Sequence, residues 1–349
     1  MEPLVIDGSH GEGGGQILRT ALALSAVLQR PVVVKNIRAK RPKPGLRSQH
    51  LASVQLLAEM TDAEVRGASL GSSELYFSPG LIRGGRYSVD VGTAGAVTLV
   101  LQTIILPALF ADGPVEIVIR GGTEVPHAPT VDYAENVFLR FLRDLGADVH
   151  LDVVRRGYYP RGGGKVVLRA SPFRDLPSVR MLDMDDEPVD GVSISAGLDP
   201  GIAERQRAGA EQILRSAGVS VGKIGLQRIP RSEVLSPGTS ITLWSRRGYV
   251  GASSLGERGI LAEVVGKRAA RWYLRQIAPM APFDANMGDQ IVPFLFLARG
   301  DSSVRIAEPT EHLVTNLWVC SQFFGESFEV VKEEAGSVRL DVHGSSSGE

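Results

Sequence analysis

The chain alternates short apolar runs with longer stretches in which apolar residues recur at helical spacing. Apolar runs of about four to eight residues between turn formers are typical of buried strands, and longer stretches with a period near 3.6 are typical of amphipathic helices. In the first half of the chain this pattern predicts strands at 3–7, 32–37, 75–78, 87–91, 115–120, 148–154 and 164–168, and helices at 16–28, 49–60, 94–106 and 130–145. Strands and helices that alternate in this way favour an α/β fold.

Several predicted helices begin near a glycine-bearing loop and carry an early glutamine or aspartate. Gly15-Gln16, the loop 92–95 followed by Gln102, and the segment 288–290 share this feature. Three similar β/α units, each presenting a helix N-terminus, would account for the repetition. Helix N-termini that meet at one place concentrate partial positive charge, which suits a nucleotide.

The pattern changes near position 180. Residues 181–188 are acidic and rich in turn formers, and the following part predicts strands at 192–196 and 240–244 and helices at 202–217 and 261–276. The earlier pattern resumes with helices at 286–298 and 312–324. We therefore predict an inserted smaller domain, 182–278, within a larger domain formed by 1–181 and 279–349.

The composition is that of an ordinary soluble globular protein, with 43% hydrophobic and 22% charged residues. The net charge of −1, from 38 basic and 39 acidic residues, argues against a protein that coats nucleic acid but permits an enzyme with a basic cleft. The single cysteine, Cys320, allows no intramolecular disulfide and fits a reducing cytoplasm. Residues 1–7 lack the features of a signal peptide, and the apolar stretch 94–111 is interpreted as a buried helix. We therefore expect a cytoplasmic protein without a membrane partner.

The basic residues are unevenly distributed. Positions 13–58 contain eight Lys or Arg residues and no Asp or Glu, and they follow the glycine-rich loop 10–16. The eight are Arg19, Arg30, Lys35, Arg38, Lys40, Arg41, Lys43 and Arg47. Backbone N–H groups of a glycine loop and guanidinium groups both pair with phosphate oxygens, so this segment predicts a site for a phosphorylated ligand. The alternative is a solvated positive face, the usual role of a run of charges.

His312 is the candidate nucleophile. It follows Thr310, a good N-cap residue, so its ring falls in the first turn of a predicted helix, where it can meet an anion. An imidazole nitrogen can attack phosphorus and form a phosphoramidate. For a lone histidine, a structural role is the alternative.

Three further polar residues stand in unusual places. Glu12 lies inside the glycine loop, where a carboxylate repels a phosphate unless a cation bridges the two. A divalent metal shared with a triphosphate would resolve this conflict, and an exposed loop glutamate is the alternative. Asp289 could cap its helix or contact a ligand, and Gln102, in an apolar helix, needs a backbone or ligand partner. The chain contains no Walker motif, dinucleotide-binding fingerprint or zinc-ligand spacing.

Taken together, these motifs make the chain resemble the RNA 3′-terminal phosphate cyclases. The matching segments run from end to end in the order expected for that family, and the most specific is Arg-Gly-x-x-Pro-x-Gly-Gly-Gly at 156–164. The segments are 10–19, 37–46, 49–51, 92–95, 121–123, 128–129, 156–164, 256–259, 289–290 and 311–316.

The resemblance implies a fold and a reaction. The fold is α/β, with three βαβαββ-type repeats forming a large domain and an inserted smaller α/β domain. In the reaction, a histidine that corresponds to His312 attacks the α-phosphorus of ATP and releases pyrophosphate. AMP then passes to an RNA 3′-phosphate, and the neighbouring 2′-hydroxyl attacks that phosphate to give a 2′,3′-cyclic phosphate and AMP. ATP, a divalent cation (Mg or Mn) and RNA with a 3′-terminal phosphate are the expected partners.

The resemblance also implies roles for individual residues. Glu12 would hold the divalent cation, and Gln16 would support the nucleotide site. The residues expected to hold adenosine are Gln102, Pro129, Asn286, Met287, Gly288, Asp289 and Gln290. The residues expected to receive ATP phosphates or the RNA terminal phosphate are Arg19, Arg38, Arg41 and Lys43. One departure concerns Asn286, because bacterial members carry there an aromatic residue that stacks on adenine.

Two alternatives remain. A non-catalytic relative of the same fold acts in ribosome assembly, but such proteins lack the nucleophile, whereas this chain has His312, Glu12 and Arg19. Enolpyruvyl transferases contain related repeats and no histidine nucleophile, so the 156–164 turn and the His312 segment disfavour that function.

Overall fold

Three sheets of the protein share one topology. The structure is a computed structural model that describes residues 2–344. In the first repeat, two parallel strands joined by a helix are followed by a second helix and two antiparallel strands, which gives the order β1-β2-β4-β3. Its elements are β1 (Leu4–Asp7), α1 (Gln16–Leu28), β2 (Val32–Lys35), α2 (Ser48–Thr61), β3 (Glu64–Arg66) and β4 (Leu75–Ser78).

The second repeat has the same connections and the corresponding order β5-β6-β8-β7. Its second helix is continuous but changes from α to π and back to α geometry. The elements are β5 (Gly85–Asp90), α3 (Val97–Leu109), β6 (Val115–Gly121), α4 (Val131–Tyr133), the π segment η1 (Ala134–Leu139), α5 (Arg140–Asp144), β7 (Val149–Arg155) and β8 (Gly164–Ala170).

The third repeat is interrupted by a long segment after its first strand. Its sheet has the order β15-β16-β14-β9, in which β9 and β14 are parallel. The elements are β9 (Arg180–Met181), α8 (Ala285–Leu297), β14 (Ser302–Ile306), α9 (Glu311–Phe324), β15 (Phe328–Lys332), the short 3-10 turn η3 (Glu334–Gly336) and β16 (Val338–Val342). Three βαβαββ repeats with one insertion confirm the predicted fold class.

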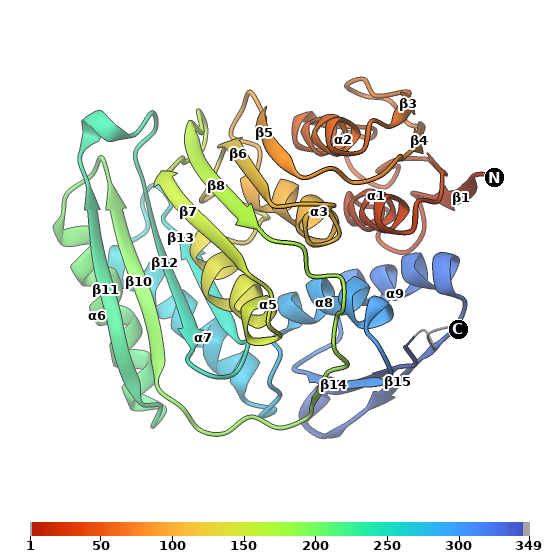
Figure 1. The fold of residues 1–349 in the computed structure, drawn as a ribbon. Helices are drawn as coiled ribbons and strands as arrows, with labels where there is room; N and C mark the ends of the chain where they lie inside the picture. The colour runs from red at the N-terminus through yellow and green to blue at the C-terminus, as the bar shows by residue number, and fades with distance from the viewer. Residues whose placement is uncertain (1, 345–349) are drawn as a thin grey trace.

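The inserted segment forms its own sheet, β11-β10-β12-β13, with two long helices packed against it (Figure 1). It has a hydrophobic core of its own, which includes Ile241, Leu243, Val265 and Tyr273. The elements are β10 (Val189–Ala196), α6 (Gly201–Ser216), β11 (Val221–Ile229), the 3-10 turn η2 (Arg231–Glu233), β12 (Gly238–Ser245), β13 (Gly251–Leu255) and α7 (Ala262–Ile277).

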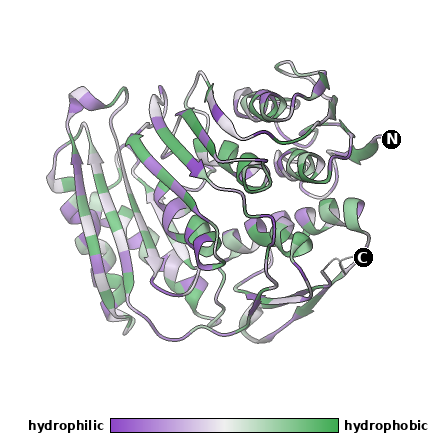
Figure 2. Cartoon of the chain, viewed as in Figure 1, coloured by the Kyte–Doolittle hydropathy of each residue, from purple (hydrophilic) through white to green (hydrophobic). Residues whose placement is uncertain are grey.

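The helices of the three repeats pack against one another in the middle of the large unit. Helix α1 packs against α3 and α9, and α8 packs against α9 (Figure 1). These helices are rich in apolar residues, whereas the outer helix α6 carries many hydrophilic positions (Figure 2). Helices α1, α2 and α9 each follow a strand, and α8 follows the inserted segment; their packing brings several helix N-termini to one region.

Several predicted boundaries differ from the observed ones. The helix expected at 94–106 begins at Val97, because residues 92–96 form a turn held by the Thr93 side chain and by Gln49, which accepts from the Ala96 N–H. Several strands were given no predicted range, among them the two-residue β9 and the strand β14 before α9. Glycines and exposed polar residues interrupt the apolar pattern of β11, and β3, β13, β15 and β16 are short or polar at their exposed positions. None of the helices within residues 2–344 combines the length and apolar character needed to cross a bilayer.

Candidate functional site

A cavity of about 820 Å³ lies where the helix N-termini meet. Gln16 is the first residue of α1, and Gln49 and His50 lie in the first turn of α2. Asn286 and His312 lie in the first turns of α8 and α9. Four helix N-termini therefore face one cavity, and their unpaired N–H groups make it favourable for an anion.

Most of the predicted site residues line this cavity. They are Glu12, Gln16, Arg19, Arg38, Arg41, Gln102, Pro129, Asn286, Asp289, Gln290 and His312. Three predicted residues do not line it. Met287 is fully buried, Gly288 packs closely against Ile306, and Lys43 is exposed, with its backbone carbonyl accepting a hydrogen bond from Arg38.

Some lining residues were not among the candidates. They are Arg47, Gln49, His50, Leu99, His127, Ala128, Tyr133, Trp272 and the strand segment Gly251–Ser253. Gln49 and His50 belong to a segment that carried the resemblance, so the sequence did hold a signal for them. Trp272 comes from α7 of the inserted segment, and only the tertiary fold places it at the cavity.

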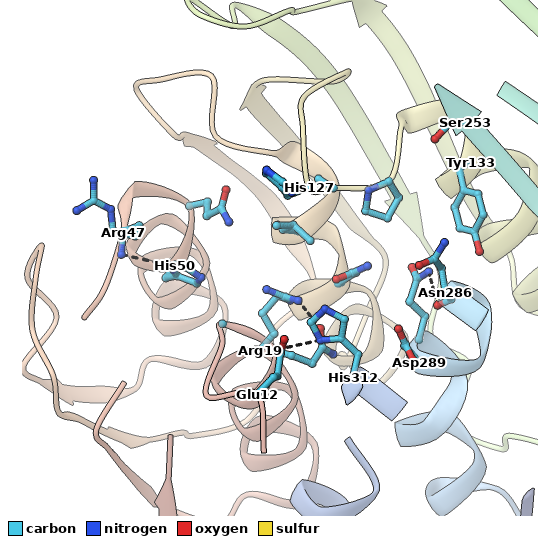
Figure 3. Close-up of a pocket in the computed structure, with 18 of the residues that line it drawn as sticks. Glu12, Arg19, Arg47, His50, His127, Tyr133, Ser253, Asn286, Asp289 and His312 are labelled. Carbon is cyan, nitrogen blue, oxygen red and sulfur yellow. Dashed lines mark hydrogen bonds and ion pairs between the residues drawn. The ribbon is translucent and has the colours of Figure 1, made fainter. Parts of the chain in front are cut away.

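His312 contacts the carboxylate of Glu12. Thr310 caps α9 by accepting a hydrogen bond from the Leu313 N–H, and this cap fixes the helix start. The Nδ1 atom of His312 lies 2.9 Å from Glu12 Oε1 (Figure 3). Arg41 donates to Glu12 Oε2 at 2.5 Å. Burial opposes ionisation of Glu12, but the contact with His312 and the charges of His312, Arg41 and Arg19 lower its pKa overall. Glu12 is thus an ionised carboxylate that faces Nδ1 and leaves Nε2 as the other reactive nitrogen.

Buried polar atoms of the cavity lack partners. Within residues 2–344, Arg19 Nε and Gln102 Oε1 are buried without a hydrogen bond, whereas Glu12 Oε1 and His312 Nδ1 face each other at 2.9 Å. A buried polar atom without a partner costs about 1–3 kcal/mol. Arg19 and Gln102 both line the cavity, where a polar ligand can supply the missing partners.

One end of the cavity is cationic. Arg38, Arg41, Arg47 and the buried Arg19 line it, together with His50. Burial lowers the pKa of Arg19 to about 10, which leaves it charged at neutral pH. Burial, reinforced by the charges of Arg19, Arg38 and Arg47, lowers the pKa of His50 to about 3. His50 is therefore a neutral hydrogen-bonding group among arginines.

The other end is neutral and partly aromatic. Tyr133, Ser253 and Asn286 lie there, across the cavity from Arg47 and His50 (Figure 3), and Trp272 also lines the cavity. His312 lies between these two groups. A cavity that is cationic at one end and neutral at the other suits a ligand that has an uncharged ring system at one end and phosphates at the other.

The aspartate that caps α8 is Asp284 and not Asp289. Asp284, one turn earlier, is the N-cap, and it accepts hydrogen bonds from the N–H groups of Met287 (2.8 Å) and Gly251 (2.7 Å). The proposed capping role of Asp289 is wrong because the helix begins at Ala285. Asp289 instead accepts a hydrogen bond from Thr310, and burial raises its pKa to about 7.

The residues present can hold a divalent cation only with help from a ligand. Within the described part of the chain, no group of three His, Cys, Asp or Glu side chains has a metal-binding arrangement. Magnesium is commonly held by one or two carboxylates together with phosphate oxygens and water. Glu12, ionised and facing the cavity, fits that kind of site.

Comparisons with known proteins point to one family. A family model described as RNA 3′-terminal phosphate cyclase matches residues 10–330. An RNA 3′-terminal phosphate cyclase of Archaeoglobus fulgidus is 47% identical over 95% of this chain and 98% of its own length. One from Methanopyrus kandleri is 44% identical over 98% of this chain and 99% of its own length. Among solved structures, an EPSP synthase from Acinetobacter baumannii aligns at 16% identity and a TM-score of 0.32, over 99% of this chain and 65% of that protein, which is too distant to inform function.

Proposed function

Because the chain belongs to the RNA 3′-terminal phosphate cyclase family, we propose that it uses ATP to convert an RNA 3′-terminal phosphate to a 2′,3′-cyclic phosphate. The reaction proceeds through a covalent histidine–AMP enzyme and an RNA adenylate. The observation that carries this proposal is the position of His312, at a helix N-terminus, against an ionised carboxylate and between a cationic and a neutral end of one cavity.

His312 acts as the nucleophile through Nε2. Glu12 Oε1 lies 2.9 Å from Nδ1 and favours the tautomer that carries its proton there, so Nε2 keeps its lone pair. The lone pair attacks the α-phosphorus of ATP, an N–P bond forms, and the P–O bond to pyrophosphate breaks. A carboxylate on the far side of the ring also stabilises the positive charge that develops on the imidazole.

The second step frees the histidine, and the third forms the cyclic phosphate. An oxygen of the RNA 3′-phosphate attacks the phosphorus of the phosphoramidate, and the N–P bond breaks. The 2′-oxygen then attacks the 3′-phosphorus, its proton is released, and the P–O bond to AMP breaks. The products are the cyclic phosphate and AMP.

The charge gradient supports an orientation for the substrates. Adenine occupies the neutral end beside Tyr133, Trp272 and Asn286, and the triphosphate extends past His312. The arginines beyond His312 remain for the terminal phosphate of RNA, which a guanidinium fork can grip through two oxygens. Glu12, with the phosphate oxygens, would hold a divalent cation (Mg or Mn), which supplies neutralising charge to the triphosphate.

The covalent intermediate provides the test. The purified protein is incubated with α-labelled ATP and Mg or Mn, without RNA, and analysed by denaturing electrophoresis. We expect acid-labile, alkali-stable label on the protein and none on His312→Ala. His150→Ala, which removes an exposed histidine on β7, is the matched control and should label normally. A folded protein that takes no label with any of several metals would contradict the proposal and favour the non-catalytic, ribosome-assembly type of relative.

A further inference from the structure

A chain of buried amides joins helix α9 to the phosphate-binding end of the cavity. Asn316 lies one turn after His312 on α9 and is fully buried. Its Nδ2 donates to the backbone carbonyl of Asp289 at 2.7 Å. Its Oδ1 accepts from Gln16 Nε2 at 3.1 Å and from Thr20 Oγ1 at 2.7 Å. One amide therefore ties α9 to both α8 and α1.

The backbone carbonyl of Asp289, which Asn316 contacts, has no hydrogen-bond donor within helix α8 itself. The backbone N–H of residue 293 would normally donate to the carbonyl of residue 289. Residue 293 is Pro293, which lies inside α8 and has no N–H. The Asp289 carbonyl is buried, so it needs another donor, and Asn316 supplies it.

This contact gives the amide chain a fixed direction. A carbonyl only accepts, so the NH₂ group of Asn316 must face Asp289 and its oxygen must face α1. Gln16 therefore presents its own NH₂ group to Asn316. The oxygen of Gln16 consequently faces Arg19, whose NH2 group donates to it. Each side-chain orientation follows from the one before.

The series of amide contacts ends at Arg19, whose side chain needs a partner to orient it. The Arg19 side chain is buried and its Nε atom has no hydrogen-bond partner among the described residues. The Gln16 contact is thus the principal hydrogen bond that orients its guanidinium group towards the cavity. Gln16, whose two amide ends are both engaged by protein groups, supports Arg19 rather than offering a free group to the ligand.

We propose that Asn316 is a positioning residue for nucleotidyl transfer, which acts through Gln16 to aim the Arg19 guanidinium at the phosphates while it holds α9, and with it His312, against α1 and α8. The inference rests on the proposed function, because it assumes that the cavity binds ATP phosphates.

Asn316→Ala and Gln16→Ala provide the test, singly and combined. In single-turnover adenylation at saturating ATP, each single variant should lower the rate constant about 10- to 100-fold, the usual effect of losing a supporting hydrogen bond. The affinity for ATP should fall by a smaller factor. The double variant should be no more than about threefold slower than the worse single variant, because residues that act as one unit are not additive.

Thr20→Val is the matched control. Thr20 donates to the same Asn316 oxygen, accepts a longer hydrogen bond of 3.3 Å from Gln16 Nε2, and does not line the cavity that holds His312. Valine keeps its shape and removes both hydrogen bonds, while Gln16 Nε2 keeps its contact with Asn316 and the Gln16 oxygen still faces Arg19. A purely structural role predicts that Thr20→Val and Asn316→Ala slow adenylation equally at equal loss of stability. The positioning role predicts that Thr20→Val lowers the melting temperature but keeps the adenylation rate within about twofold.

The outcomes separate this inference from the proposed function. Additive effects of Asn316→Ala and Gln16→Ala, or equal slowing by Thr20→Val, would overturn the positioning role while the wild-type protein still labels. If Asn316→Ala does not fold, Gln16→Ala against Thr20→Val decides the question, because a normal rate for Gln16→Ala excludes the relay. A wild-type protein that takes no label would instead remove the proposed function itself.

Discussion

His50 shows how the site uses a single buried side chain. Its Nδ1 accepts a hydrogen bond from the Arg47 N–H at 3.2 Å, so a neutral ring carries its proton on Nε2. Nε2 lies so close to Gly15 that a Cβ at that position would collide with it, which explains a glycine there. His50 can therefore donate a hydrogen bond to a phosphate oxygen without adding charge to a cluster of arginines.

The pKa of His50 predicts a pH effect on stability. The ordinary value is 6.5, and burial, with the neighbouring arginines, lowers it to about 3 in the folded protein. Between these values the unfolded chain binds a proton that the folded chain does not, so this group costs stability as the pH falls below 6.5. From pH 7 to pH 5, the wild type should lose about 2 kcal/mol more than His50→Asn, since one proton corresponds to about 1.4 kcal/mol per pH unit.

Urea unfolding of both proteins at the two pH values measures this difference. Asparagine keeps an acceptor near the position of Nδ1, so the start of α2 remains capped. Other titrating groups, such as Asp289, affect both proteins alike and cancel in the comparison. Parallel pH profiles for wild type and variant would show that His50 is not held neutral by the fold.

At the scale of elements, α7 brings an aromatic residue from the inserted segment to the cavity. Trp272 is half-buried and lines the cavity, and the Arg275 guanidinium lies 5.1 Å from its ring centroid. Arg275 is held in turn by Glu308 at 2.6 Å. Asn286, on the first turn of α8, cannot stack on a base. Trp272 and Tyr133 both line the cavity, and we expect the larger ring of Trp272 to stack on adenine.

Removal of this ring should weaken ATP binding. Stacking of a base on an aromatic ring contributes about 1–3 kcal/mol, so Trp272→Ala should raise the Kd for ATP about 5- to 150-fold. The measurement is calorimetric titration in the His312→Ala background, which prevents turnover. Trp244→Ala, which alters a half-buried tryptophan of β12 that does not line the cavity, should bind normally. Asn286→Tyr should tighten ATP binding and should partly restore it in the Trp272→Ala variant. An unchanged Kd in Trp272→Ala, or a double variant that binds no better than Trp272→Ala, would contradict the assignment.

The sequence predicted elements whose signals are local. The helix at 16–28 has the predicted bounds because a glycine loop precedes it and its apolar spacing is regular. The first turn of α9 follows from Thr310 as the cap. The cap of α8 was misassigned, because Asp284 and Asp289 are both acceptable cap residues and only the tertiary contacts of Asp284 with Tyr133 and Gly251 distinguish them.

The rest of the site depends on packing between distant segments. His312 and Glu12 could be chosen as chemically active residues, but their contact depends on how α9 packs beside the loop after β1. The amide chain through Asn316 has no sequence signal, because Gln16 and Asn316 are 300 residues apart. Trp272 follows an ordinary amphipathic helical pattern, so nothing in its own neighbourhood distinguishes a cavity residue from a core residue.

At the scale of the whole molecule, a buried ion cluster joins the sheet of the second repeat to the inserted sheet. Arg156, after β7, pairs with Glu124 at 2.5 Å and with Asp132 at 2.6 and 2.8 Å. It also donates to Gln227 on β11 at 2.9 Å. Glu124 and Asp132 flank the segment that carries His127 and Pro129 to the cavity. The cluster therefore couples the junction of the two units to one wall of the site.

Breaking this cluster should cost far more than breaking its surface counterpart. Arg156→Met leaves two buried carboxylates without their cation, which typically costs about 3–5 kcal/mol. Arg169, on β8, also pairs with two carboxylates, Glu116 and Asp152, but it is half-exposed, so Arg169→Ala should cost at most about 1 kcal/mol. Denaturant unfolding measures both free energies of unfolding.

The cost of Arg156→Met should also depend on pH. Burial already raises the pKa of Glu124 to about 7, so protonation can neutralise this carboxylate once Arg156 is gone. The cost of Arg156→Met should therefore be smaller at pH 5 than at pH 8, and a cost equal to that of Arg169→Ala would show that the cluster does not hold the two units together.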